Sequence, residues 1–224
     1  MLIRVDFHCH TRYSKDSLTS PESLMAASRK KGLDKVVITD HNTIAGAVAA
    51  RQLDPQRFIV GEEILTQEGE LLAFFVSEEV PPGLPAYEAI RRLKAQGAFI
   101  SVSHPFDVLR CGWLPADLEA ILPEIDAIEV FNARVIQRSA NQGAQEFALA
   151  HRLRGTVGSD AHTAFELGAA YLVLPDFDDA ATLRQALPQA ERHTAVSPQW
   201  VHLFSRLAVW QKALLGGQKR ATGA

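Results

Sequence analysis

The sequence has few cysteines, no long apolar run and no surplus of basic residues. Its two cysteines, Cys9 and Cys111, form neither a CxxC pair nor a disulfide framework, so we expect a reducing, cytoplasmic location. No apolar stretch approaches the ~18 residues of a membrane span. The first residues also lack the apolar core of a secretion signal. We therefore expect no membrane partner.

Charge and size exclude further classes of protein. The chain has 23 Lys and Arg against 26 Asp and Glu, a formal net charge of −3 at pH 7. Proteins that bind extended nucleic acid without sequence preference normally carry a basic surplus, so we expect no such partner. A few local arginines could still hold a nucleotide-sized substrate. The 224 residues suit one large α/β domain, and they do not indicate the oligomeric state.

Short β-branched runs alternate with longer amphipathic runs along most of the chain. The predicted strands are residues 2–7, 35–39, 57–61, 71–76, 98–103, 127–131, 155–158 and 171–174. Helical patterns lie between most of them. The first begins with Ser20 as N-cap and Pro21 at the first helical position, and it ends at Gly32. This alternation predicts mostly parallel strands with helices outside, in a doubly wound sheet or a barrel. A turn at Gly69 predicts a hairpin insertion.

Ligand-type side chains follow six of the predicted strands. In chain order these residues are His8, His10, Asp40, His41, Glu62, Glu63, His104, Asn132, Asp160 and His162, with Glu129 inside the strand that precedes Asn132. In a (β/α) barrel the C-terminal strand ends converge on one mouth, where active sites lie. We therefore expect these side chains to converge. His151, His193 and His202 follow no strand, and we expect them to lie outside the site.

The residue types suit divalent metal ions. Neutral imidazole and carboxylate groups bind Zn²⁺, Mn²⁺ and Fe²⁺. Alternation along an extended chain places His8 and His10 on one face. Glu63 is the best candidate for a carboxylate that bridges two ions. The ligands are too many for one tetrahedral site, so we expect two or three metals.

Several of these residues also have simpler interpretations. Asp40 could cap the following helix or support a ligand rather than bind an ion itself. Glu129 could be a buried residue that orients a ligand. Cys9 points to the opposite face of its strand from the histidines, which favours a small buried apolar residue over a ligand.

The segments DFHCHTRYSKDS, ITDHNT, GEEI, SHP, EVFN and GSDAH, in this order and spacing, resemble the PHP (polymerase and histidinol phosphatase) family of metal-dependent phosphoesterases. The resemblance runs from about Val5 to about Pro175. It implies a distorted (β/α)7 barrel, TIM-like, with a cluster of two or three metals. We expect this barrel over residues 1–175. Residues 176–224 resemble the C-terminal extension of small stand-alone members, and we expect them to be helical, packed on the barrel and disordered at the end.

The resemblance also implies a role for each candidate ligand. The first ion is bound by His8, His10, Glu63 and Asp160; the second by Glu63 and His104; and the third by Asp16, His41 and His162. Catalytic roles fall to His8, Asp160 and His162, and Asp40, Glu129 and Asn132 are candidates for supporting them. Several relatives complete the second site with a histidine after EVFN. Here that region reads ARVIQRS and contains none, which leaves occupancy of the second site open.

The same region supplies Arg134 and Arg138, which are candidates for binding a substrate phosphate with two hydrogen bonds. The expected activity is hydrolysis of a small phosphorylated metabolite or nucleotide through a metal-bound hydroxide. Three alternatives stay open: a phosphodiesterase or nuclease acting on short nucleic acid, an amidohydrolase-type metal hydrolase, and a non-catalytic metal-binding module. The amidohydrolase class commonly has a bridging lysine where this chain has Glu63.

Overall fold

The computed structural model describes residues 1–221, and their side chains as far as Leu215. The strands are β1 (Leu2–Cys9), β2 (Lys35–Ile38), β3 (Phe58–Leu65), β4 (Glu70–Phe74), β5 (Phe99–Val102), β6 (Ala127–Asn132), β7 (Arg154–Gly158), β8 (Ala170–Pro175) and β9 (Glu191–Thr194). The α-helices are α1 (Pro21–Lys31), α2 (Ala45–Leu53), α3 (Ala86–Ala95), α4 (Pro115–Ile121), α5 (Arg138–His151), α6 (Ala180–Ala186) and α7 (Val201–Ala221).

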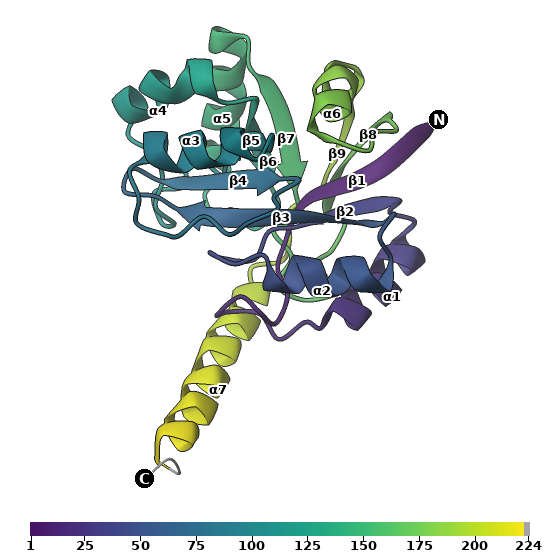
Figure 1. Ribbon diagram of the computed structural model, residues 1–224, viewed down its shortest axis with the longest axis vertical. Helices are drawn as coiled ribbons and strands as arrows, with labels where there is room; N and C mark the ends of the chain where they lie inside the picture. The colour runs from purple at the N-terminus through teal and green to yellow at the C-terminus, as the bar shows by residue number, and fades with distance from the viewer. Residues whose placement is uncertain (222–224) are drawn as a thin grey trace.

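The strands form one sheet that curls into a nearly closed barrel (Figure 1). Their order is β7-β6-β5-β4-β3-β2-β1-β8-β9, with β4 antiparallel to both of its neighbours. At the remaining gap, between β1 and β7, the amide of Asp160 donates a hydrogen bond of 2.7 Å to the carbonyl of His8. The amide of His10 donates one of 2.8 Å to the carbonyl of Ala161. The predicted α/β barrel is confirmed, and β3 and β4 form the hairpin expected around Gly69.

Local sequence signals set several boundaries as predicted. The side chain of Ser20 accepts a hydrogen bond from the amide of Ser23, Pro21 begins α1, and Gly32 ends it in the left-handed conformation with φ of 67°. Strand β3 is longer than predicted and continues to Leu65, so Glu62 and Glu63 lie within it. Two elements were not predicted: the seven-residue α4 and the exposed β9, whose polar residues show no apolar periodicity.

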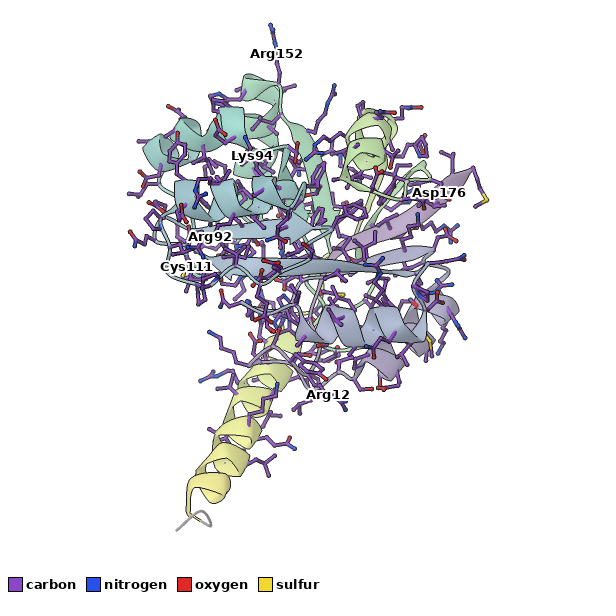
Figure 2. All side chains as sticks on the ribbon, in the orientation of Figure 1. Arg12, Arg92, Lys94, Cys111, Arg152 and Asp176 are labelled. Atoms are coloured by element: carbon purple, nitrogen blue, oxygen red, sulfur yellow. The ribbon has the colours of Figure 1, made fainter. Side chains whose placement is uncertain are left out.

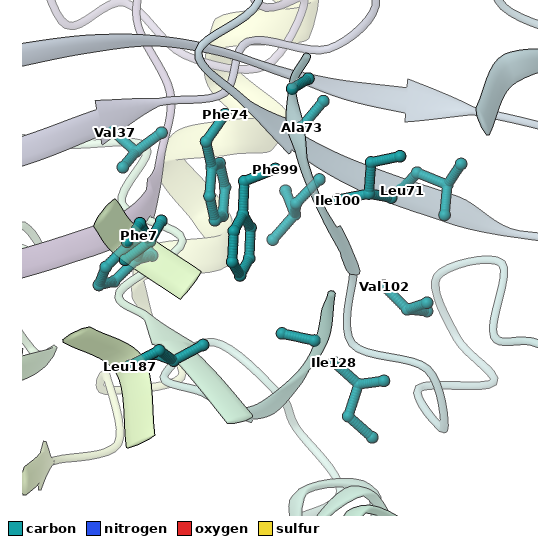
Figure 3. Close-up of a cluster of buried hydrophobic side chains, with 14 of the residues drawn as sticks. Phe7, Val37, Leu71, Ala73, Phe74, Phe99, Ile100, Val102, Ile128 and Leu187 are labelled. Carbon is teal, nitrogen blue, oxygen red and sulfur yellow. The ribbon is translucent and has the colours of Figure 1, made fainter. Parts of the chain in front are cut away.

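Aromatic rings form the centre of the core (Figure 3). The ring of Phe74 lies 5.5 Å from that of Phe7 and stacks on that of Phe99 at 5.5 Å, with an interplanar angle of 6°. All three side chains are fully buried. Because Phe74 ends the antiparallel β4 and Phe99 begins β5, their pair lies at the end of the barrel away from the ligand-type residues. The barrel therefore has an apolar base and a polar mouth.

The chain after Pro175 contains more than helices. Strand β9 pairs with β8, which pairs with β1, and α6 lies between β8 and β9 in sequence. Helix α7 begins against the barrel, where Val201 and Ala208 are buried, and then extends away from it (Figure 1). It continues to Ala221, while residues 222–224 of the expected disordered tail lie outside the described residues. The division of the chain at Pro175 stays a prediction.

Helix α7 is 21 residues long. Even so, within residues 1–221 no helix combines the length and the apolar character that crossing a membrane requires. The outward side chains of α7 project into open space, and Arg12 lies where the helix meets the barrel (Figure 2).

Replacing Phe99 with alanine should lower the free energy of unfolding by about 3–5 kcal/mol, because the ring is fully buried and stacked on Phe74. Urea denaturation followed by circular dichroism measures the change. The control is Leu149→Ala, which removes a side chain that is 81% exposed and should alter stability by less than about 0.5 kcal/mol. Equal losses in the two variants would contradict the packing described.

Candidate metal centre

Four side chains point their donor atoms at one another at the mouth of the barrel. His8 Nε2 lies 3.1 Å from His10 Nε2, 3.3 Å from Glu63 Oε2 and 3.5 Å from Asp160 Oδ1. His10 Nε2 lies 3.4 Å from Glu63 Oε2 and 3.1 Å from Asp160 Oδ1. A tetrahedral ion with ligands at ~2.0–2.1 Å has ligands about 3.3–3.4 Å apart. The distances from the two imidazole nitrogens to each other and to the two carboxylate oxygens are therefore of the size that ligands of one ion have.

Hydrogen bonds on the far side of each imidazole leave Nε2 free to bind an ion. His8 Nδ1 lies 3.0 Å from the carboxylate of Glu129, and His10 Nδ1 lies 3.0 Å from Ser14 Oγ. The carboxylate accepts, and the Ser14 hydroxyl already donates to Asp40 at 2.6 Å, so in both histidines Nδ1 carries the hydrogen. The two Nε2 atoms thus face each other at 3.1 Å, a contact that either a proton or a metal ion between them would stabilise.

The surrounding charges favour a cation at this point. Burial lowers the pKa of His8, but the carboxylates of Glu63 and Asp160 more than offset it and hold the pKa well above its usual range. Burial and the neighbouring imidazoles of His162 and His41 lower the pKa of His10 to about 3, so this ring is neutral, as a ligand must be. Glu63 Oε2 is buried and accepts no hydrogen bond. The donor set and this unsatisfied oxygen fit a divalent metal ion.

A second group of donors lies on the other side of Glu63. His104 Nε2 lies 3.3 Å from Glu63 Oε1 and 3.5 Å from Glu70 Oε2. His41 Nδ1 lies 3.0 Å from Glu63 Oε2, and His41, Glu63 and Glu70 can together hold an ion. Burial and the adjacent Glu63 carboxylate raise the pKa of Glu70 to about 7. Glu70 therefore lies beside His104, which with Glu63 forms the predicted second site.

A third group lies beside the first. Asp16 Oδ2 lies 3.1 Å from His162 Nε2 and 3.5 Å from His41 Nε2. His162 Nδ1 donates to the carbonyl of Asp160 at 2.8 Å, which leaves Nε2 free. The ring of His10 lies 4.2 Å from that of His162 and 4.4 Å from that of His41. The third group thus adjoins the first through these rings.

Residues behind the donors hold them in place. Asp40 does not cap α2; it accepts hydrogen bonds from the amide of Thr11 and from the hydroxyls of Thr11 and Ser14, at 2.6–2.7 Å. Glu129 accepts from His8, from the amide of His104 at 2.9 Å and from the Asn132 amide at 3.1 Å. Through these three hydrogen bonds the Glu129 carboxylate orients the side chains and backbone around it.

The backbone is adapted to the cluster at two positions. Asp160 has a φ of 51°, in the left-handed region that a non-glycine residue adopts at some energetic cost. Gly158 lies against β1 so closely that a Cβ atom there would be 2.2 Å from the Cβ of His8 and 2.9 Å from Glu129 Oε1. Only a residue without a side chain allows His8 to reach its position.

The donors open into a cavity of about 240 Å³ that α7 partly walls. Arg110, Arg134, His202 and Ser205 are among its lining residues. His202 was expected outside the site, but the path of α7 places it in the cavity wall. Arg138 is exposed at the start of α5 and does not line this cavity.

The two arginines that line the cavity form ion pairs with different acidic residues. Arg110 forms ion pairs with Asp160 and with Asp107, the latter at 2.8 Å, and Arg134 Nε lies 3.0 Å from Glu166. Arg110 follows no strand and belongs to no motif, so the sequence offered no signal for it. A larger groove of about 630 Å³ opens at the base of the barrel, but it is lined by none of the histidines.

Comparisons with known proteins agree with this geometry. The PHP domain family model matches residues 6–79, and the PHP-associated family model matches residues 138–191. An uncharacterized protein of Methanocaldococcus jannaschii is 35% identical over 144 residues, which cover 58% of this chain and 82% of that protein.

Two solved structures share the fold at low sequence identity. A protein of Bifidobacterium adolescentis assigned as a metal-dependent phosphoesterase has a TM-score of 0.62 at 20% identity, covering 83% of this chain and 96% of its own. Endonuclease Q, in complex with a 27-mer duplex that carries an abasic lesion at the active site, also has a TM-score of 0.62, at 15% identity. The match covers 84% of this chain and 57% of the endonuclease.

Replacing Glu70 with alanine should lower the metal content by about one ion per chain, because Glu70 and His104 share the second group. Elemental analysis after dialysis measures the ratio. Glu78→Ala, which removes an exposed carboxylate, is the matched control and should retain every ion. Equal metal content in both variants would show that Glu70 is not a ligand.

Replacing Gly158 with alanine should lower metal affinity by at least about 10-fold, because the new methyl group displaces His8. Titration of metal-free protein with Zn²⁺ or Mn²⁺ in a calorimeter measures the affinity. The control is Gly143→Ala in α5, where the added Cβ has ordinary contact distance, 3.6 Å from Phe106. Wild-type affinity in Gly158→Ala would mean that β1 and β7 separate easily.

Proposed function

The chain belongs to the PHP family of metal-dependent phosphoesterases, and from this premise we propose that it hydrolyses a small phosphorylated metabolite or nucleotide. The observation that carries the proposal is the cluster of His8, His10, Glu63 and Asp160, whose two carboxylates form the floor of a cavity that arginines also line. Such a floor suits a phosphate, which carries negative charge and many acceptor oxygens.

We assign the donors to three ion sites that share residues or lie side by side. The first site comprises His8, His10, Glu63 and Asp160; the second Glu63, His104 and Glu70; and the third Asp16, His41 and His162. Divalent ions bound there would lower the pKa of water and neutralise charge on a phosphate. Nitrogen and oxygen donors without a thiolate fit zinc, manganese or iron.

The arginines have separate roles in the proposal. The Arg134 guanidinium is buried and oriented by Glu166 and by Ser205 Oγ, 3.0 Å from Nη2, so it is preorganised toward the cavity. We assign it to binding the substrate phosphate. Arg110 pairs with Asp160 and bonds Asn132 at 3.2 Å, so its charge lies beside the first site and would stabilise negative charge that develops there. Arg138 is the weaker candidate because it is exposed outside the cavity.

The cavity favours a small substrate. A volume of about 240 Å³, walled on one side by α7, fits a phosphorylated metabolite better than a duplex. An endonuclease function is the second candidate because endonuclease Q shares the fold. However, more than two fifths of that protein lies outside the match with this chain. We also propose a cytoplasmic location, for which the free thiols of Cys9 and Cys111 are the support.

Metal-loaded protein should hydrolyse p-nitrophenyl phosphate and a subset of a phosphorylated-metabolite panel. His8→Ala and Asp160→Ala should each lower kcat/KM by more than about 100-fold, since each removes a donor of the first site. Release of p-nitrophenol and of inorganic phosphate measures the rates.

The matched control is His193→Ala, which removes an exposed imidazole stacked on Tyr171 at the outer edge of the sheet. This variant should keep wild-type activity. Chelation of the ions should abolish hydrolysis and re-addition should restore it. Wild-type turnover in both His8→Ala and Asp160→Ala would refute the assignment. Cleavage of amides in place of phosphate monoesters would favour an amidohydrolase, and cleavage of short DNA would favour a nuclease.

A further inference from the structure

Helix α7 presents an apolar stripe whose side chains are about half exposed, and the Phe165 ring packs on its first residue, Trp200, at 5.5 Å. Trp200, directly before the helix, is followed by Leu203, Leu207, Trp210 and Leu214 at alternating intervals of three and four residues. Their exposed fractions are 48%, 59%, 55%, 64% and 51%. Beyond its first turns, α7 itself extends away from the barrel (Figure 1). Soluble proteins rarely leave so large an apolar surface uncovered.

The opposite face of the helix contacts the rest of the protein. Val201 and Ala208 are buried against the barrel. The ammonium of Lys212 donates hydrogen bonds to the carbonyls of Arg12, at 2.7 Å, and Ser14. One side of the helix is therefore held against the barrel, and the apolar stripe lies on the other side.

The spacing of the stripe indicates its partner. Apolar residues that repeat at 3.5-residue intervals form the seam of a coiled coil, which packs against a second helix with the same repeat. A surface helix that lies on a globular core needs a broader apolar face than this seam. The stripe thus fits one helix of similar length and pattern.

The stripe is large enough to form most of a dimer interface. Its five side chains offer an area on the order of 600 Å². A stable protein interface buries about 800 Å² per partner. One α7 from each of two copies therefore supplies about three quarters of the area that such an interface requires.

The charges also favour a second copy. All four charged residues after Trp200 are basic, namely Arg206, Lys212, Lys219 and Arg220, so residues 1–200 hold 19 Lys and Arg against 26 Asp and Glu. The basic charge of this segment complements the acidic remainder of a second copy. Antiparallel pairing sets Trp210 against Leu207 and Leu203 against Leu214, whereas parallel pairing sets two large indoles in one layer.

A membrane surface fits less well. Helices that lie in a lipid headgroup layer carry a polar face rich in Lys and Arg. Within residues 201–215, Lys212 is engaged by backbone carbonyls, and Arg206 is the remaining basic side chain. We propose that α7 pairs antiparallel with α7 of a second copy of this chain. Because α7 also supplies His202 and Ser205 to the cavity, this pairing fixes one wall of the site.

Analytical ultracentrifugation of the full, metal-loaded chain tests the proposal. The wild type should sediment as a dimer at micromolar concentration. Leu207→Glu combined with Leu214→Glu should weaken dimerisation by at least 100-fold, because it places charges in the seam. Leu149→Glu, at an exposed leucine of α5, is the matched control and should remain a dimer. Circular dichroism confirms that each variant is folded.

The orientation of the pair is tested by disulfide formation. In a Cys111→Ser background, a mixture of the Leu203→Cys and Leu214→Cys proteins should form a crosslinked heterodimer, and Leu203→Cys alone should not crosslink. A monomeric wild type overturns the proposal, as does a dimer that the double glutamate variant leaves intact. Wild type that is monomeric and binds vesicles of phosphatidylglycerol would assign the stripe to a membrane.

Discussion

Two imidazole nitrogens lie within 3.5 Å of each other and of two carboxylate oxygens at the buried mouth of the barrel. Buried groups of this kind are costly unless a charge of opposite sign compensates them. The rest of the structure depends on meeting this constraint. Glu129, Ser14 and Asp40 fix the rings from behind, Gly158 gives His8 room, and the left-handed conformation of Asp160 turns its carboxylate inward.

The sequence predicts the convergence of these side chains because its signal is a property of parallel strands. Their C-terminal ends share one mouth, so His8, His104 and Asp160 could be grouped without knowledge of the packing. Glu70 was missed for the same reason. It begins β4, the antiparallel strand, and the N-terminal end of such a strand reaches the mouth. A search that considers only the residues following each strand does not find Glu70.

Other residues were missed because their positions depend on tertiary structure. Arg110 lies in a loop without a motif, and only the folded loop brings its guanidinium to Asp160. His202 reaches the cavity because α7 starts at the barrel rim, a placement that helical periodicity does not specify. Strand β9 is short, exposed and polar, and only its pairing with β8 identifies it. The element types were thus easier to predict than the contacts between them.

The closure between β1 and β7 has a consequence for synthesis of the chain. Its hydrogen bonds join the backbones of His8 and His10 to those of Asp160 and Ala161. Strand β1 is synthesised first, and the barrel therefore cannot close until β7, one of its last strands, has also been synthesised. Until then the two early histidines lack both their neighbouring strand and the Asp160 carboxylate. An ion that needs both His8 and Asp160 could therefore bind only late in biogenesis, and it would join two strands of a barrel that is already almost complete.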